Sequence, residues 1–151
     1  MRILVIGRGE VGDALVAVLS QAHEVEWKDK EPKEIRPGFD VAHVCLNYAY
    51  LGSNNAERTS VFYRIVRGYY EQYRPRFLDI CSTVPPGTTR ALGLPAVHST
   101  TRGLHPNLAE SIRTFVKFVS GPPEVAQAVA AVYKKAGVKT RTFNRPETTE
   151  L

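Results

Sequence analysis

Residues 3–12 of the chain read ILVIGRGEVG, and this stretch decides the fold. The first four residues are apolar and predict a buried strand, which runs directly into Gly7-x-Gly9-x-x-Gly12. Gly7 permits a tight turn, Gly9 leaves room for a pyrophosphate beside the backbone, and Gly12 lets the next helix lie close to the sheet. The stretch therefore predicts a strand, a turn and a helix arranged to bind phosphate groups.

The helix is expected to begin near Glu10, with apolar residues at helical spacing: Val11, Leu15, Val18 and Leu19. Phosphates would lie against the N–H groups at its N-terminus, where the helix dipole is positive. Residues expected to contact the cofactor in this turn are Gly7, Arg8, Gly9, Glu10, Val11 and Gly12.

An acidic residue, Asp29, follows a second predicted strand at residues 23–27. A carboxylate at this place accepts hydrogen bonds from the adenosine ribose hydroxyls and repels a 2′-phosphate. Together the glycines and Asp29 predict a dinucleotide-binding site with NAD, rather than NADP, as the cofactor. The alternative is a glycine turn in an α/β protein that binds no nucleotide.

The composition is that of a globular protein: 151 residues, 43% hydrophobic and 23% charged. The sequence has no apolar run as long as a membrane span and no signal peptide, so we expect a cytoplasmic protein without a membrane partner. Cys45 and Cys81 lie in apolar, strand-like runs, which predicts buried reduced thiols without an activating partner. We expect no metal site.

The net charge is +5, and the densest basic stretch is residues 58–76, where tyrosines alternate with arginines. Read as a helix, this stretch turns one set of residues toward the core: Phe62, Ile65, Val66, Tyr69 and Tyr73. The arginines then form a solvated helix face, an interpretation that we favour over a nucleic-acid surface.

Strands and helices alternate along the chain, which predicts a Rossmann-like, doubly wound α/β fold with a mostly parallel sheet. The expected strands are residues 3–6, 23–27, 41–46, 77–81, 95–98, 114–119 and 138–143. The expected helices begin near residues 10 and 88 or span residues 56–73 and 123–135. We expect residues 1–145 to form one dinucleotide-binding domain.

The link from Asp29 to Phe39 is too short for a crossover helix and a further strand. The first half of the fold should therefore be shortened, which leaves the adenine side of the cleft more open.

Ligands of such sheets bind at the carboxyl ends of the strands. The residues expected there include Asn47, Ser82 and Thr83, the last two as contacts of the nicotinamide-side ribose or of a water. Alternatively, Thr83 only caps the turn that follows. His98 and His105 are candidate general bases, against the alternative of packing or surface roles; no partners complete a zinc site with them.

Several stretches resemble the NAD-binding domain of the UDP-glucose/GDP-mannose 6-dehydrogenases, within the 6-phosphogluconate dehydrogenase-like superfamily. They are residues 1–29, CSTVPPGTT at 81–89, TFVKFVSG at 114–121 and PETTEL at 146–151, the last similar to the start of the family's long central helix. The resemblance implies that Thr83 matches a threonine that helps to order a catalytic water. It also implies NAD as cofactor and a sugar nucleotide as substrate.

Members of this family oxidise an alcohol twice, through a thioester on a cysteine. The carboxylate that the family carries after the next strand is replaced here by HSTTR at residues 98–102. The family's catalytic cysteine, lysine and asparagine belong to regions that these 151 residues do not include.

We therefore expect a domain that is not catalytically complete alone. The alternatives are a non-catalytic nucleotide-binding or assembly module, or a small independent oxidoreductase that uses His98 or His105. Each of these proteins could form a homo-oligomer. Residues 146–151 begin a helix that is too short to be stable alone.

Overall fold

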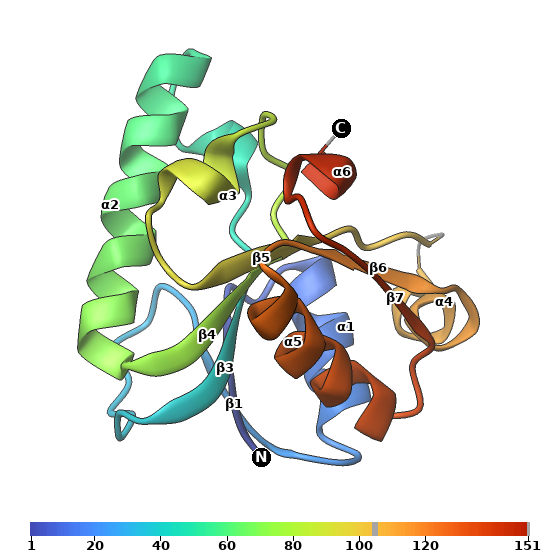
Figure 1. Cartoon of the computed structure of the whole chain (residues 1–151). Helices are drawn as coiled ribbons and strands as arrows, with labels where there is room; N and C mark the ends of the chain where they lie inside the picture. Colours follow the sequence, from blue (N-terminus) through green and yellow to red (C-terminus); the bar gives the residue numbers. More distant parts are fainter. Residues whose placement is uncertain (104–105, 151) are drawn as a thin grey trace.

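The structure is a computed structural model and describes residues 1–103 and 106–150. Its centre is one seven-stranded sheet with the order β2-β1-β3-β4-β5-β6-β7 (Figure 1). The strands are β1 (Arg2–Ile6), β2 (Glu24–Lys28), β3 (Phe39–Val44), β4 (Pro75–Ile80), β5 (Ala96–Ser99), β6 (Lys117–Ser120) and β7 (Thr140–Phe143). All neighbouring strands are parallel except β5 and β6. The predicted Rossmann-like, mostly parallel α/β fold is confirmed.

Helices cover both faces of the sheet (Figure 1). They are α1 (Glu10–Leu19), the 3₁₀ turn η1 (Tyr48–Tyr50), α2 (Asn55–Tyr73), α3 (Thr88–Ala91), α4 (Leu108–Thr114), α5 (Pro123–Lys135) and α6 (Glu147–Glu150). Two apolar cores result. One packs α1, α4 and α5 against the sheet, and the other packs η1 and α2 against the opposite face.

The shortened first half is visible in the strand order. The chain leaves the edge strand β2 at Lys28 and returns at Phe39 as β3, on the other side of β1, without an intervening helix or strand. The crossover places the carboxyl ends of β1 and β3 side by side, which is where a doubly wound sheet binds its ligands.

One helix was missed by the sequence pattern, and the strand after it begins later than predicted. Residues 108–114 form α4, and Leu108 and Ile112 pack one turn apart into the same core as α1. The predicted strand 114–119 was therefore wrong at its start: Thr114 ends the helix and β6 begins at Lys117. Phe115 and Val116 lie between them and are 47% and 37% exposed.

The long helix α2 behaves as its sequence predicts. The Asn54 side chain accepts a hydrogen bond from the Glu57 N–H at 2.9 Å and caps its N-terminus. Of its expected core residues, Phe62, Val66 and Tyr73 are buried. The helix ends at Arg74, which adopts a left-handed conformation just before Pro75.

Residues 146–150 do form a helical turn, although the segment is too short to be stable in isolation. Its docking supplies the stabilisation. The Ser120 hydroxyl donates to the Pro146 carbonyl at 3.1 Å, and Arg90 pairs with Glu147 at 2.6 Å. The Glu150 carboxylate accepts a hydrogen bond from the Thr88 N–H at 3.2 Å, at the start of α3. Tertiary contacts therefore hold α6 on the sheet.

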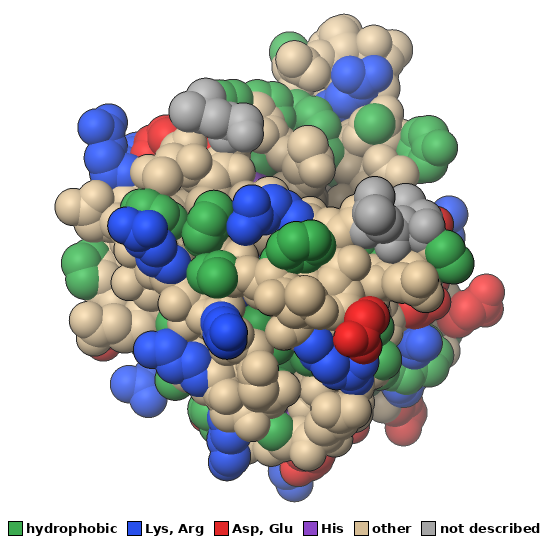
Figure 2. Space-filling model, turned by 90° about the vertical axis from the view of Figure 1, so that its right-hand side faces the viewer, with side chains coloured by type: hydrophobic (Ala, Val, Ile, Leu, Met, Phe, Trp, Pro, Cys, Tyr) green, Lys and Arg blue, Asp and Glu red, His purple; other side chains and the backbone are tan. Residues whose placement is uncertain are grey.

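Among the helices of the described residues, none is long and apolar enough to cross a membrane. The face on the side of β7 and α4 carries Lys and Arg side chains that are dispersed among uncharged ones (Figure 2).

Candidate functional site

The glycine turn has the geometry that its spacing predicts. Gly7 adopts φ +97°, and its N–H donates to the Lys28 carbonyl at 2.8 Å. A Cβ on Gly7 would lie 2.6 Å from the Cys45 carbonyl oxygen, and one on Gly12 would lie 1.8 Å from the Gly7 carbonyl oxygen. Gly7 and Gly12 are therefore required by the close approach of backbone to backbone.

Gly9 differs from its two neighbours. Its φ is an ordinary −77°, and a Cβ there would meet no atom within 4 Å. Gly9 is also the N-cap of α1, and no side chain caps the helix. Open space beside the N–H groups at the positive end of a ten-residue helix fits a pyrophosphate.

A cavity of about 720 Å³ opens at this point, at the carboxyl ends of β1, β3 and β4. Its volume is in the range of ligand sites. The residues that line it are Gly9, Glu10, Val11, Cys45, Leu46, Asn47, Tyr48, Ala49, Asn55, Arg58, Cys81, Ser82, Thr83 and Pro85. Most of the predicted cofactor residues thus meet around one cavity. Gly7 and Gly12 lie in the backbone beneath it.

The predicted adenine-side residue, Asp29, lies outside the lining of this cavity, after the end of β2. Asp29 is half-buried directly after β2. Arg8 pairs with Asp13, and its guanidinium lies 4.5 Å from the Trp27 ring centroid. Lys33 lies over the same ring at 3.8 Å. Arg8 therefore belongs to a cation–aromatic cluster beside the glycine turn rather than to the lining of the cavity.

The two hydroxyl residues after β4 differ in exposure. Ser82 is buried, and its hydroxyl donates to the Val44 carbonyl at 3.3 Å. Thr83 is exposed at the edge of the cavity. Of the two, Thr83 has the side chain that is open to a ligand.

His98 is buried, and both of its ring nitrogens are engaged within the protein. It is 3% exposed, with Nδ1 2.8 Å from Thr149 Oγ1 and Nε2 2.9 Å from the Ser82 carbonyl oxygen. Because both ring nitrogens are hydrogen-bonded inside the protein, the geometry argues against His98 as a general base. It supports the alternative packing role. His105 lies outside the described residues.

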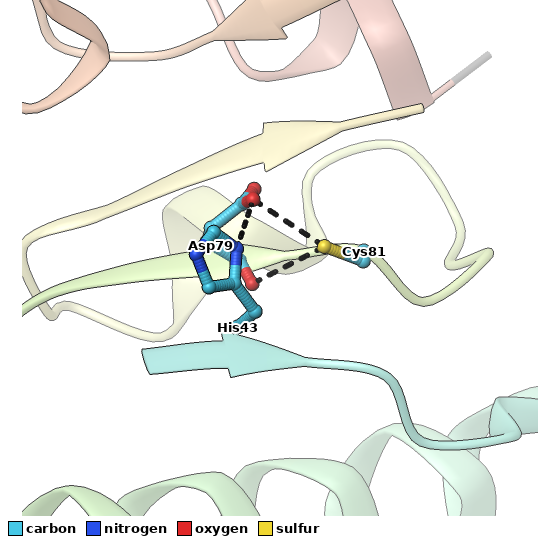
Figure 3. A group of neighbouring side chains, drawn as sticks. All are labelled: His43, Asp79 and Cys81. Carbon is cyan, nitrogen blue, oxygen red and sulfur yellow. Dashed lines mark hydrogen bonds and ion pairs between the residues drawn. The ribbon is translucent and has the colours of Figure 1, made fainter. Parts of the chain in front are cut away.

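A buried polar cluster that was not predicted from the sequence includes His43, Asp79 and Cys81 (Figure 3), the last of which lines the cavity. Nδ1 of His43 lies 2.7 Å from Oδ2 of Asp79, and both side chains are completely buried. The Tyr133 hydroxyl donates to the same carboxylate oxygen at 2.6 Å, and Sγ of Cys81 lies 3.4 Å from it. Three side chains, from β3, from the residue after β4 and from α5, thus converge on one oxygen of Asp79 in β4.

The cluster holds a separated pair of charges. Burial acts to lower the pKa of His43, but the hydrogen bond and charge of Asp79 outweigh it and raise the pKa to about 9. Burial acts to raise the pKa of Asp79, yet the hydrogen bond and charge of His43 hold it well below its usual range. His43 is therefore protonated and Asp79 ionised at neutral pH.

Cys81 is drawn into the same network. Burial and the charge of Asp79 act to raise the pKa of Cys81, but the neighbouring thiol of Cys45, His43 and the charge of Lys117 outweigh them and lower it to about 6. The expectation of thiols without an activating partner was wrong. The partners lie far away in sequence and come together only through the pairing of β3 with β4.

These atoms are spaced as in a hydrogen-bonded network. His43, Asp79 and Cys81 offer ligand atoms within 4.8 Å of one another. Ligand atoms in a tetrahedral zinc site are about 3.3 Å apart, as its bond lengths require. The 2.7 Å between His43 and Asp79 is shorter and is the length of a charge-assisted hydrogen bond. The absence of a bound metal stays a prediction.

Solved structures share this fold. A UDP-D-ManNAc dehydrogenase from Pyrococcus horikoshii superposes with a TM-score of 0.80 at 18% identity, over 99% of this chain and 48% of that chain. A UDP-glucose dehydrogenase from Pyrobaculum islandicum superposes with a TM-score of 0.66 at 16% identity, over 99% of this chain and 47% of that chain. A Myxococcus stipitatus imine reductase variant in complex with NAD⁺ superposes with a TM-score of 0.68 at 14% identity, over 99% of this chain and 56% of that chain.

The chain has the Rossmann-like fold of these dehydrogenases and reductases and spans about half the length of each. No protein-family model matches its sequence, and no curated protein is similar enough in sequence to be matched.

Proposed function

We propose that the chain is the NAD-binding domain of a sugar-nucleotide dehydrogenase-like oxidoreductase, and that it is not catalytically complete alone. The observation that carries the proposal is the glycine turn. Gly7 and Gly12 are fixed by backbone contacts at the head of a 720 Å³ cavity, while Gly9 faces open space. This arrangement fits the phosphates of a dinucleotide.

The residues after the strands indicate where each end of the cofactor would bind. The pyrophosphate would lie against the N–H groups at the start of α1, beside Gly9. The adenosine ribose would hydrogen-bond to Asp29, whose carboxylate repels a 2′-phosphate and favours NAD over NADP. The nicotinamide end would extend toward Asn47 and Thr83 on the other side of the cavity.

When bound, the nicotinamide accepts or donates a hydride. The chain's own contribution is to orient that ring, with the exposed Thr83 hydroxyl as the group that holds the ribose or a water. Because His98 is occupied by Ser82 and Thr149, we propose that the acid/base group comes from a further domain or partner. A sugar nucleotide is the substrate that we propose for the completed enzyme.

Titration calorimetry with NAD and NADP tests this proposal. We expect NAD to bind and NADP to bind at least about tenfold more weakly. In Asp29→Asn the discrimination should shrink, because the charge that repels the 2′-phosphate is gone. Glu71→Gln, an exposed change on α2, is the matched control. Failure of both nucleotides to bind at millimolar concentration would refute the proposal.

A non-catalytic nucleotide-binding module is the second candidate, and the placement of His98 favours it over a small independent oxidoreductase. Turnover of NAD with a sugar nucleotide by the isolated chain would exclude the module. We further propose a cytoplasmic protein that can form homo-oligomers.

A further inference from the structure

Two thiols lie opposite each other where β3 and β4 end. Val44 and Ile80 are paired in the parallel register, and the Cys81 N–H donates to the Val44 carbonyl at 2.9 Å. The next pair in this register is Cys45 and Cys81. Paired residues of parallel strands point to the same face, and neighbouring strands lie about 4.8 Å apart. That spacing is within the Cα–Cα range of disulfides, about 4.4–6.8 Å.

Side-chain contacts agree with the register. Cys45 and Cys81 pack into the same apolar cluster, on the face of the sheet covered by α1 and α5. The two cysteines therefore lie on the same face of the sheet and line the same cavity.

Both thiols can be reached from outside through one opening. Cys45 is half-buried and Cys81 is 7% exposed, and both line the cavity that begins at Gly9. A small oxidant that enters this cavity meets the two sulfur atoms at its floor.

The surroundings make the two thiols unequal. Cys81 faces His43 and the buried amine of Lys117, whose Nζ is held 3.0 Å from the Thr100 carbonyl oxygen and 2.9 Å from Thr101 Oγ1. These cations oppose the Asp79 carboxylate, whose Oδ2 lies 3.4 Å from the Cys81 sulfur, and lower the pKa of Cys81, whereas the pKa of Cys45 is raised. One sulfur is thus prepared as a nucleophile and the other as the thiol that resolves its oxidation product.

We propose that Cys45 and Cys81 form a redox-active dithiol that hydrogen peroxide oxidises to a disulfide, and that nucleotide binding and this oxidation oppose each other. The Cys81 thiolate attacks the peroxide oxygen, the O–O bond breaks, and the departing hydroxide takes up a proton as water. The Cys45 sulfur then attacks the Cys81 sulfenic acid. The S–S bond forms, and the S–O oxygen leaves as a second water with the Cys45 proton. Two thiols lose two electrons, and the peroxide gains them.

The coupling to nucleotide runs through Cys45. Its N–H bonds to the Ile6 carbonyl at 2.8 Å, and its own carbonyl oxygen lies against Gly7. Drawing Cys45 toward Cys81 therefore displaces the residue that supports the glycine turn. A bound nucleotide in turn covers the entrance to the sulfurs. This coupling rests on the proposed function, whereas the thiol chemistry does not.

The experiment is peroxide oxidation of the whole chain, followed by intact mass and tryptic mapping without reductant. We expect the loss of two hydrogen masses, a crosslink between the peptides that contain Cys45 and Cys81, and complete reversal by dithiothreitol. Cys45→Ser should instead accumulate a sulfenic acid on Cys81 that dimedone traps. Cys81→Ser should react at least about tenfold more slowly than the wild-type chain. Circular dichroism checks that both variants fold.

The wild-type mass tests the crosslink even where a variant fails to fold. Absence of the crosslink, or equal reactivity of Cys81→Ser, would overturn it. Saturating NAD should slow the crosslink about tenfold, and the crosslinked chain should bind NAD more weakly. If calorimetry shows NAD binding but NAD gives no protection, the coupling is wrong. If NAD does not bind at all, the proposed function fails while the crosslink still stands.

Discussion

Nδ1 of His43 lies 2.7 Å from Oδ2 of Asp79, and neither side chain is exposed to solvent. The two residues are partners in the register of β3 and β4, 36 positions apart in sequence. The Tyr133 hydroxyl closes the network from α5 at 2.6 Å. This contact joins the centre of the sheet to the helix that covers it, directly below the candidate cofactor cavity.

Removing the charge of this pair should destabilise the fold. In Asp79→Asn, His43 loses the carboxylate that holds its proton, and the Tyr133 hydroxyl loses its strongest acceptor. We expect the free energy of unfolding to fall by about 3 kcal/mol, as for other broken buried pairs. Urea unfolding followed by circular dichroism measures it. The exposed change Glu71→Gln should stay within about 0.5 kcal/mol. Similar values for both variants would contradict the account.

The dependence of stability on pH should reveal the proton that moves between His43 and Cys81. Between pH 6.5 and 9 the unfolded chain keeps one proton, on the Cys81 thiol. The folded chain also keeps one, because the pKa of His43 is raised to about 9 and that of Cys81 is lowered to about 6. Equal proton counts predict an unfolding free energy that changes little across this window.

The variant Cys81→Ser removes the thiol that carries the proton in the unfolded chain, so the proton counts of the two states no longer match. Asp79 still holds the pKa of His43 above its usual value, so the folded chain then binds more protons than the unfolded chain, and stability is greatest below pH 6.5 and is lost as pH rises through the raised pKa of His43. We expect a loss of about 1.4 kcal/mol per pH unit. Urea titrations at several pH values measure it. A flat profile in Cys81→Ser, or a steep one in the wild-type chain, would contradict the assignment.

Two glycines of one motif should respond differently to alanine. In Gly12→Ala the methyl group would lie 1.8 Å from a backbone oxygen, so we expect a loss of at least about 3 kcal/mol of stability. In Gly9→Ala the methyl group meets open space, so the stability should change by less than about 1 kcal/mol. NAD affinity, measured by calorimetry, should nevertheless fall about tenfold in Gly9→Ala. Equal loss of stability in both variants would be the contrary result.

The docking of α6 can be tested with neighbouring threonines. Thr149 is buried and lies 2.8 Å from Nδ1 of His98, whereas Thr148 is exposed in the same turn. Thr149→Val leaves the His98 nitrogen without its partner and should cost about 2 kcal/mol. Thr148→Val is the control and should cost less than about 0.5 kcal/mol. Thermal unfolding of the two variants gives the comparison, and equal midpoints would contradict the docking.

The fold could be predicted because its signals are local. The glycine turn, the apolar strands and the short link after Asp29 each constrain only a few neighbouring residues, and together they imply a sheet with a shortened half. The helix α4 escaped prediction because its seven residues carry only two buried apolar positions, Leu108 and Ile112. So short a helix depends on packing against α1 rather than on its own pattern.

The cofactor cavity was largely predictable, but the buried cluster beneath it was not. His43 and Asp79 lie in strands that otherwise read as apolar, and a buried carboxylate is rare unless its partner is known. That partner follows only from the strand register. One signal was present: His43-x-Cys45 and Asp79-x-Cys81 repeat the same spacing at the ends of two neighbouring strands. Aligned in parallel, they place four polarisable side chains on one face.

The central claim is that NAD occupies the cavity between the start of α1 and the end of β4. Amide chemical shifts of the isotope-labelled chain, recorded during a titration with NAD, test it most directly. We predict that the largest shifts occur at Gly9, Glu10, Val11, Asn47 and Thr83, with small ones at Ala126 and Gln127 on α5. A titration that leaves Gly9 and Thr83 unchanged, or that moves only residues away from this cavity, would contradict the account.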